Sequence, residues 1–442
     1  MILFKLNNLK LTSFVLYFCL SLSNVWGQSI SIVKAINMIL NRDPGLKACY
    51  YQTKYYSNLI KKRKDQFMPS YSFSSSTGIF DNHITSNSFQ YSDDVKFNSK
   101  EDSGEFYNIG ASLYLPIIKE KTLFGHNAPS IMSAIELEKK NKYECRLLKQ
   151  STIKKVLDIF LSYFQAQREI KIFSEEVKFY NWLLEQAQKK YEKGIISKID
   201  VINIDNILQQ KKLSLQITNN NLLITKKRLA ILLDNEPKNL ELETNELINL
   251  LNYKLPSLST IKKTIHNHPQ LEALRANKQY FYYKYRQSKN LVWPEIGMTI
   301  ATLFHKEHDS PQKNLSYLLF SLNWNIDLTK FDLIKEDFNL YLKAKNMYKN
   351  SEKNILYNTL IDLQNIKQQQ LELQQQQLQL NFQKSLKEKL TLQFLKGLID
   401  PNELINCTID IEELEKEIVT EEINLINNII IFKQNIGISW NE

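Results

Sequence analysis

The stretch Asp43-Pro44-Gly45-Leu46-Lys47-Ala48 recurs 225 residues later as His268-Pro269-Gln270-Leu271-Glu272-Ala273. Phe67-Met68-Pro69-Ser70 recurs at the same offset as Val292-Trp293-Pro294-Glu295. Farther on, Tyr191-Glu192-Lys193-Gly194-Ile195-Ile196 matches Phe394-Leu395-Lys396-Gly397-Leu398-Ile399 at an offset of 203. A repeat this long differs from the short periods of solenoids and propellers. It predicts a chain made of two similar halves, 28–255 and 256–442.

The first 27 residues have the pattern of a cleaved secretory signal. Lys5 and Lys10 precede an apolar run from Leu11 to Leu22, and a cleavage site is expected before Gln28. The run is too short to span a bilayer as a helix, although an uncleaved anchor is the alternative. No later stretch approaches the roughly 18 apolar residues of a transmembrane helix. Insertion into a membrane after export would therefore have to use strands.

The composition excludes several classes of function. The formal net charge is +10, but Lys and Arg are mixed with Asp and Glu along the chain, which favours solvated helix faces over a nucleic-acid site. Cys49, Cys145 and Cys407 have no short spacing and predict neither a disulfide framework nor a metal site. No catalytic motif stands out, so we expect neither an enzyme nor a cofactor.

Each half contains a predicted strand pair, at 69–117 and at 294–326. After Pro69, the apolar residues Tyr71, Phe73 and Ile79 alternate with serines and a glycine, and 108–115 alternate in the same way. Strands of about 10–12 residues have the length of tilted strands in a membrane barrel. A soluble antiparallel sheet with one wet face is the alternative. Polar loops are expected at 81–105 and 305–314.

Long helices are predicted at 130–191 and 327–394, because neither segment contains Gly or Pro. Each would extend about 90–105 Å. Tips at 192–199 and 395–402 would join them to return helices at 200–233 and 403–434. Apolar residues then recur every seven positions, which predicts coiled-coil seams along both return helices: Val201, Leu208, Leu215, Leu222, Leu229, and Leu404, Ile411, Ile418, Leu425, Phe432.

This doubled order of motifs resembles the TolC-like outer-membrane efflux proteins. The resemblance is carried by 41–46, by Pro69 before the serine-rich strand, by Tyr191-x-x-Gly194-x-x-Ser197-x-x-Asp200-Val201, and by their counterparts in the second half. It implies a homotrimer with a mainly α fold that includes β structure. Each chain would give four strands to a trimeric twelve-stranded outer-membrane β-barrel. A long periplasmic α-helical coiled-coil barrel would continue it, with two structural repeats per chain.

The resemblance also implies a function. The protein would be the outer-membrane exit duct of a tripartite efflux or type I secretion system, exporting small molecules or proteins passively from the periplasm. Its partners would be two further copies, outer-membrane lipid, a periplasmic adaptor (membrane fusion protein) and an inner-membrane pump of RND or ABC type. No nucleic acid, metal or cofactor is implied. The alternative from another class is a periplasmic structural coiled-coil tether without a pore.

In the family the tips dock the adaptor. By position, the docking residues are Gly194, Ile195, Ile196, Ser197, Gly397, Leu398, Ile399 and Asp400. The residues themselves allow a structural explanation, in which each glycine ends a helix in the left-handed conformation and the apolar pair packs on the turn. Both explanations can hold together.

The family's entrance is narrowed by side chains that correspond here to Tyr191, Asp200, Phe394, Glu403 and Asn406. The family has a carboxylate where Asn406 stands, and an arginine where Ile399 stands, so the closed state would be held differently. Three copies of Glu403 around one axis would attract cations. Asp200 and Glu403 would alternatively serve only as partners of the helix dipole.

Overall fold

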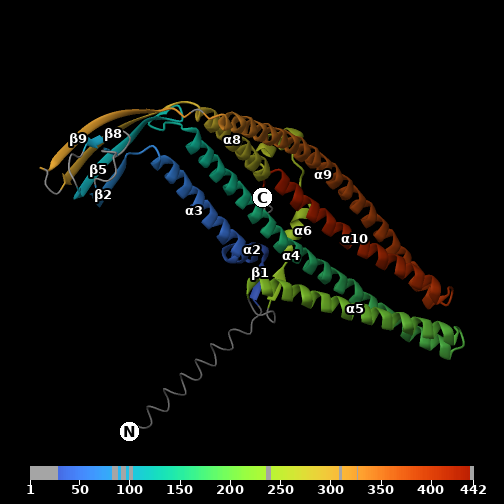
Figure 1. Ribbon diagram of the computed structural model, residues 1–442. Coiled ribbons are helices and arrows are strands. Elements are labelled where there is room, and N and C mark those ends of the chain that lie inside the picture. Colours follow the sequence, from blue (N-terminus) through green and yellow to red (C-terminus); the bar gives the residue numbers. More distant parts are fainter. Residues whose placement is uncertain are drawn as a thin grey trace, which may run out of the picture. The chain divides into compact units, whose positions relative to one another are not determined.

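The computed structural model describes residues 28–81, 88–90, 96–98, 103–234, 240–307, 311–325 and 327–438. The predicted signal and its cleavage site, and much of the predicted loop 81–105, lie outside these residues. The described chain is mainly helical with an antiparallel sheet, as the sequence predicts (Figure 1). It divides into two compact units. We call Cys49–Tyr143 with Glu272–Asn350 the sheet unit, and Met1–Ala48, Glu144–Leu271 and Ser351–Glu442 the helical unit.

Four strands make the main sheet of the sheet unit, in the order β2-β5-β8-β9. They are β2 (Ser70–Asp81), β5 (Ser103–Lys119), β8 (Glu295–Glu307) and β9 (Lys313–Asn323). All neighbours are antiparallel. The central pair β5–β8 joins strands from the two predicted halves, so the two strand pairs form one continuous sheet.

Three short strands accompany this sheet. β6 (Thr122–Leu123) pairs with the end of β5. Inside the predicted loop 81–105, β3 (Ser88–Gln90) pairs with β4 (Lys96–Asn98). That segment therefore contains a small antiparallel pair of its own.

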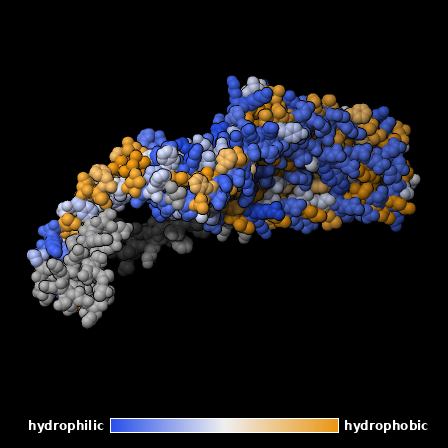
Figure 2. Space-filling view, turned by 45° about the horizontal axis from the view of Figure 1, so that its top comes forward, coloured by the Kyte–Doolittle hydropathy of each residue, from blue (hydrophilic) through white to orange (hydrophobic). Residues whose placement is uncertain are grey.

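The register gives the main sheet two chemically different faces. Along one row, Tyr71 lies opposite Leu113, Leu113 opposite Ile300, and Ile300 opposite Leu318. On the other face, Ser72 lies opposite Ser112, and their hydroxyl oxygens are 2.6 Å apart. The apolar face is open in the single chain: its residues include Phe73 at 84% exposure. Figure 2 shows hydrophobic residues gathered along the strands.

The repeated prolines begin helices. Pro44 starts α3 (Pro44–Asp65) and Pro269 starts α8 (Pro269–Asn290). The residue before each lies outside the helical region, with ψ of 117° at Asp43 and 124° at His268. Proline clashes with a helical residue before it but fits the first helical position, so both residues mark clean helix boundaries. The long helices are α4 (Pro129–Glu192) and α9 (Thr329–Leu395).

The helical unit also contains α2 (Ile32–Arg42), α5 (Lys198–Leu233), α6 (Asn245–Leu251), α7 (Leu258–Thr264), the 3-10 helix η2 (Ile265–Asn267) and α10 (Pro401–Asn435). β1 (Gln28–Ser31) pairs in parallel with β7 (Leu240–Glu243). The seven-residue pattern marks the inward face of α10: Leu404, Ile411, Ile418, Leu425 and Phe432 are all buried. On α5, Leu208 and Leu229 are buried and the other positions are half-buried. Among the described residues, none of the helices is both long and apolar enough to cross a membrane.

The cysteines correct one expectation. Cys407 is free and buried, but Cys49 and Cys145 are disulfide-bonded. The prediction from their spacing was therefore wrong for these two residues. Spacing reveals local cysteine motifs, whereas residues far apart in sequence meet only through the tertiary fold.

Candidate functional site

The first tip is a tight turn between α4 and α5. Gly194 has φ of +71°, a conformation that side-chain-bearing residues rarely adopt. The Gly194 amide donates to the Tyr191 carbonyl at 2.9 Å, and the Ile195 amide to the Lys190 carbonyl at 2.9 Å. Ser197 then caps α5 in a capping box with Asp200. The sequence of this segment thus ends one helix and begins the next within five residues.

The second tip repeats this geometry between α9 and α10. Gly397 has φ of +73°, and its amide donates to the Phe394 carbonyl at 3.0 Å. The Leu398 amide donates to the Gln393 carbonyl at 3.0 Å. Asp400 caps α10, with Pro401 at the first helical position. The two turns share their hydrogen-bonding pattern but not their capping chemistry.

Each tip has one exposed and one packed member of its apolar pair. Ile195 and Leu398 are 56% and 69% exposed. Ile196 and Ile399 are partly buried against a tip cluster whose buried members are Tyr180, Leu183, Ala187, Ile204, Leu208, Phe394, Leu404 and Ile405. The structural explanation from the sequence therefore accounts for the second residue of each pair. It leaves Ile195 and Leu398 without a packing role among the described residues.

The five residues expected at the constriction lie in different environments. Glu403 and Asn406 are exposed on the first turns of α10, and Tyr191 is 45% exposed. Asp200 is committed to the cap, because its Oδ2 accepts from the Ser197 amide at 3.0 Å and from its hydroxyl at 2.7 Å. Phe394 is fully buried. Within one chain, Glu403, Asn406 and Tyr191 are the exposed members of this set.

Lys190 is a tip residue that the sequence analysis missed. Its ammonium lies 3.8 Å from the centroid of the Phe394 ring and also donates to the Phe394 carbonyl. Burial lowers the pKa of Lys190. The contact joins the end of α4 to the end of α9. A lysine one turn before the glycine was its only sequence signal.

A buried charged cluster farther from the tips was also missed. Lys211 of α5 forms ion pairs with Glu176 of α4, at 3.6 Å, and with Glu412 of α10. Lys416 pairs with the same Glu412 and lies 4.5 Å from the centroid of the Phe173 ring. The cluster thus connects α4, α5 and α10. Its signal in the sequence was the position of Lys211, Glu412 and Lys416 within three residues of the predicted apolar seams.

Burial controls the electrostatics of this cluster. It raises the pKa of Glu176, while Lys211 and Lys416 oppose the shift. It also lowers the pKa of Lys211, against the attraction of Glu176. The nearby Tyr180 hydroxyl is buried without a hydrogen-bond partner in the described chain, and burial raises its pKa. Removing one partner of such a cluster costs more than the cluster contributes, because the remaining charge stays buried.

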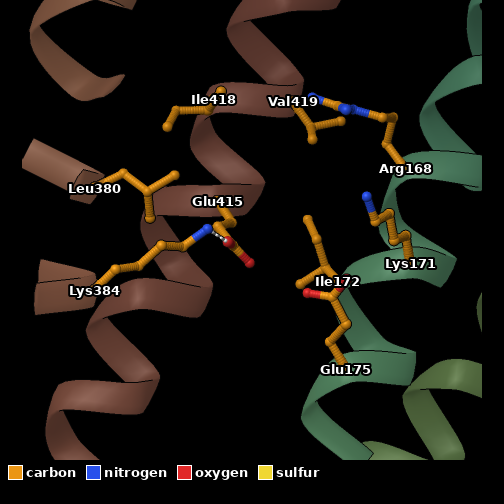
Figure 3. Close-up of a pocket in the computed structure, with 9 residues that line it drawn as sticks. All are labelled: Arg168, Lys171, Ile172, Glu175, Leu380, Lys384, Glu415, Ile418 and Val419. Carbon is orange, nitrogen blue, oxygen red and sulfur yellow. Dashed lines mark ion pairs between the residues drawn. The ribbon is translucent and has the colours of Figure 1, made fainter. Parts of the chain in front are cut away.

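A cavity of about 200 Å³ lies among α4, α9 and α10 of the helical unit (Figure 3). Its apolar wall includes Ile172, Leu380 and Val419, and charged side chains surround it. Lys384 pairs with Glu415 at 2.6 Å, which is the dashed contact in Figure 3. Arg168 pairs with Glu422 at 3.1 Å. Three of the charged residues that line the cavity, Arg168, Lys384 and Glu415, are therefore already matched by ion pairs.

The described residues contain no group of three or more His, Cys, Asp or Glu that could hold a metal ion. A scan against protein-family models and a search of curated proteins gave no match. Among solved structures, the outer-membrane channel OprN matches with TM-score 0.73 and 14% identity, over 93% of this chain and 91% of its own. The transmembrane channel CusC matches with TM-score 0.77 and 11% identity, over 92% of both chains. VceC, an outer-membrane protein of Vibrio cholerae, matches with TM-score 0.75 and 10% identity, over 92% of this chain and 96% of its own.

The chain has the TolC-like fold. The resemblance stated from the motifs is thereby confirmed at the level of the fold, over nearly the whole chain. The neighbours with this TolC-like fold are channel and outer-membrane proteins, not enzymes. Identities of 10–14% explain why only the order of short motifs, and no extended sequence match, pointed to it.

Proposed function

We propose that this protein is the outer-membrane exit duct of a tripartite efflux or type I secretion system. It would export small molecules or proteins passively, drawing energy from an inner-membrane pump of RND or ABC type through a periplasmic adaptor. Support comes from the TolC-like fold and from a sheet whose chemistry suits a membrane. The division of the chain into two repeats, 28–255 and 256–442, belongs to this proposal.

The main sheet carries the argument. Its apolar face exposes large side chains, among them Phe73, Ile109, Leu318 and Phe320. In water such a face would drive aggregation, whereas in lipid it is the outer wall of a barrel. In the described chain, β2 and β9 are the two edges of this sheet. Lipid cannot satisfy the backbone groups of a free edge, so strands of further copies are needed to close the wall. Three chains with four strands each would supply twelve.

The tips would form the periplasmic entrance. The exposed Ile195 and Leu398 offer apolar contacts to an adaptor at two turns of the same geometry. In the trimer, Glu403 and Asn406 would point into the entrance, with Asp200 and Tyr191 beside them. Phe394 would not face the entrance, because it is buried in the tip cluster. It would instead hold the two tips of one chain against each other. This arrangement gives each chain two similar docking points with different caps.

The experiment is single-channel recording. The full protein is purified in detergent, its mass is determined, and it is added to planar bilayers. A trimer that produces discrete conductance steps supports the proposal. Protein that stays soluble without detergent, as a monomer or dimer that never conducts, supports the non-pore tether instead. No observation favours that tether, because a soluble tether would leave the apolar face of the main sheet exposed to water.

A further inference from the structure

An open cavity of about 980 Å³ lies in the sheet unit, between the end of α3, the turn after β5 and the start of α4. These elements are labelled in Figure 1. Its wall is largely apolar, with Phe67, Met68, Leu123, Phe124 and Ile131 among the lining residues. Met68, Leu123 and Phe124 are 59%, 58% and 55% exposed. Large apolar side chains thus surround an open cavity where the described chain offers nothing to cover them.

The rim of this cavity is basic. Lys64 comes from the last turn of α3, and Lys121 and His126 from the turn after β5. No Asp or Glu is among the described residues that line the cavity. Two acidic residues adjoin lining residues in the sequence, Asp65 and Glu120, and neither lines the cavity. A basic rim above an apolar wall complements an amphipathic anion.

The turn that shapes the cavity has a strained backbone. Glu120, Lys121, Phe124 and Asn127 have φ between 48° and 58°, which is uncommon for residues other than glycine. Gly125 has φ of +72°, and a Cβ there would lie 2.5 Å from Cγ of Phe67. Such strain costs free energy and persists only where the surrounding structure enforces it.

Glu120 enforces this turn from its buried side. Its Oε2 accepts from the Ser130 amide at 3.0 Å, and its Oε1 accepts from Gln287 Nε2 at 3.3 Å. Its carbonyl accepts from Asn290 Nδ2 at 2.7 Å. The carboxylate is therefore turned into the protein, which leaves the cavity rim purely basic. The turn is held as a preformed element rather than as a loose connection.

The cavity lies at the end of β2 and β5 that joins the helices. If the strands cross a membrane, this end is at the membrane surface. Lys64 and Phe67 shortly precede β2, and Lys121 shortly follows β5. Trp293, which precedes β8, is 51% exposed, and the ammonium of Lys121 lies 3.9 Å from the centroid of its ring. Tryptophan and lysine together are typical of the boundary between lipid and water. This end of the strands leads into the helices, so it is the periplasmic end in the proposed orientation.

We propose that this cavity is a binding site for one anionic phospholipid of the membrane's periplasmic leaflet. The headgroup phosphate would lie between Lys64 and Lys121, and an acyl chain would pack against the exposed Met68, Leu123 and Phe124. This inference rests on the proposed function, because it requires the strands to cross the membrane. The competing occupant is a second copy of the chain, and the experiment separates the two.

The test is native mass spectrometry of the full protein in detergent, titrated with phosphatidylglycerol or phosphatidylcholine of identical acyl chains. Wild type is expected to retain phosphatidylglycerol more strongly. Lys64→Gln with Lys121→Gln should lower this retention by about fivefold for each charge removed, to the level of phosphatidylcholine. The matched control, Lys61→Gln with Lys62→Gln, removes two charges from the same end of α3 outside the cavity. It should keep most of the preference.

Equal retention of the two lipids by wild type, or an unchanged preference in the Lys64/Lys121 variant, would overturn the site. A photo-crosslinking residue at Leu123 gives a second reading, since attachment to lipid supports the site and attachment to another copy overturns it. Conductance of the same preparation is recorded in parallel. Protein that conducts without a lipid preference refutes only the lipid site, whereas protein that never conducts refutes the exit duct.

Discussion

The ammonium of Lys190 lies 3.8 Å from the centroid of the Phe394 ring and donates a hydrogen bond to the carbonyl of the same residue. Lys190 is four residues before Gly194, and Phe394 is three residues before Gly397. One lysine therefore contacts both the side chain and the backbone of Phe394, the residue just before the other tip. A movement of one tip away from the other has to break this contact.

The first prediction concerns this contact. Phe394→Ala removes a fully buried ring and should destabilise the tip region by about 3–5 kcal/mol, because the ring is lost and a cavity remains. Hydrogen exchange should become faster in 187–208 and 390–405. Leu395→Ala, at a position 47% exposed, is the control and should change little. Equal protection in both variants would show that Phe394 does not hold the tips together.

The second prediction uses the raised pKa of Glu176. Because the folded protein binds this proton more tightly than the unfolded chain, the free energy of unfolding should fall as the pH rises from about 4.5 through the raised pKa. Glu176→Gln should remove that part of the slope. The variant also loses the ion pair with Lys211, which lowers its stability at every pH, so the test is the slope and not the absolute stability. Melting curves between pH 4 and 8 measure it. The exposed neighbour Glu175→Gln is the control, and identical slopes for all three proteins would contradict the prediction.

The third prediction concerns ion selectivity. Glu403→Ala should reduce the preference for cations in planar bilayers, because three carboxylates would leave the entrance of the proposed trimer. The reversal potential in a salt gradient measures the change. Glu413→Ala removes an exposed carboxylate from another face of α10 and should leave the potential near that of wild type. An unchanged potential in Glu403→Ala would remove this residue from the constriction.

The fourth prediction concerns the two faces of the sheet. Ile109 is on the apolar face and Ser76 on the opposite face, both near the middle of their strands. Ile109→Arg should destabilise the membrane-inserted form by about 2–4 kcal/mol, whereas Ser76→Arg should insert normally. Folding into lipid vesicles, followed by gel mobility, compares them. If Ser76→Arg fails and Ile109→Arg inserts, the assignment of the faces is reversed.

The sequence predicted features that depend on nearby residues. Pro44 and Pro269 begin helices, and Gly194 and Gly397 end them, because a proline or a left-handed glycine acts on its immediate neighbours. The alternation around Phe73 gave the correct apolar face, since side chains in a strand alternate regardless of the partner strand.

Features that depend on distant residues were not predictable in this way. The pairing of β5 with β8 joins segments far apart in the chain. Lys211 meets Glu176 and Glu412 only when three helices come together, so each charge looked like part of a solvated helix face. The burial of Phe394 and the strained turn around Gly125 likewise arise from contacts with other elements. The sequence shows each of these residues, but not which residues of other helices and strands they contact in the fold.

The two edges of the main sheet, β2 and β9, have a consequence for how the protein is made. In the proposed exit duct a single chain cannot satisfy its edge strands or shelter its apolar face, so insertion and association would be one event rather than two. Its rate should then rise more steeply than linearly with protein concentration. The amount of protein made, rather than the stability of a single chain, would then determine how many complete oligomers form.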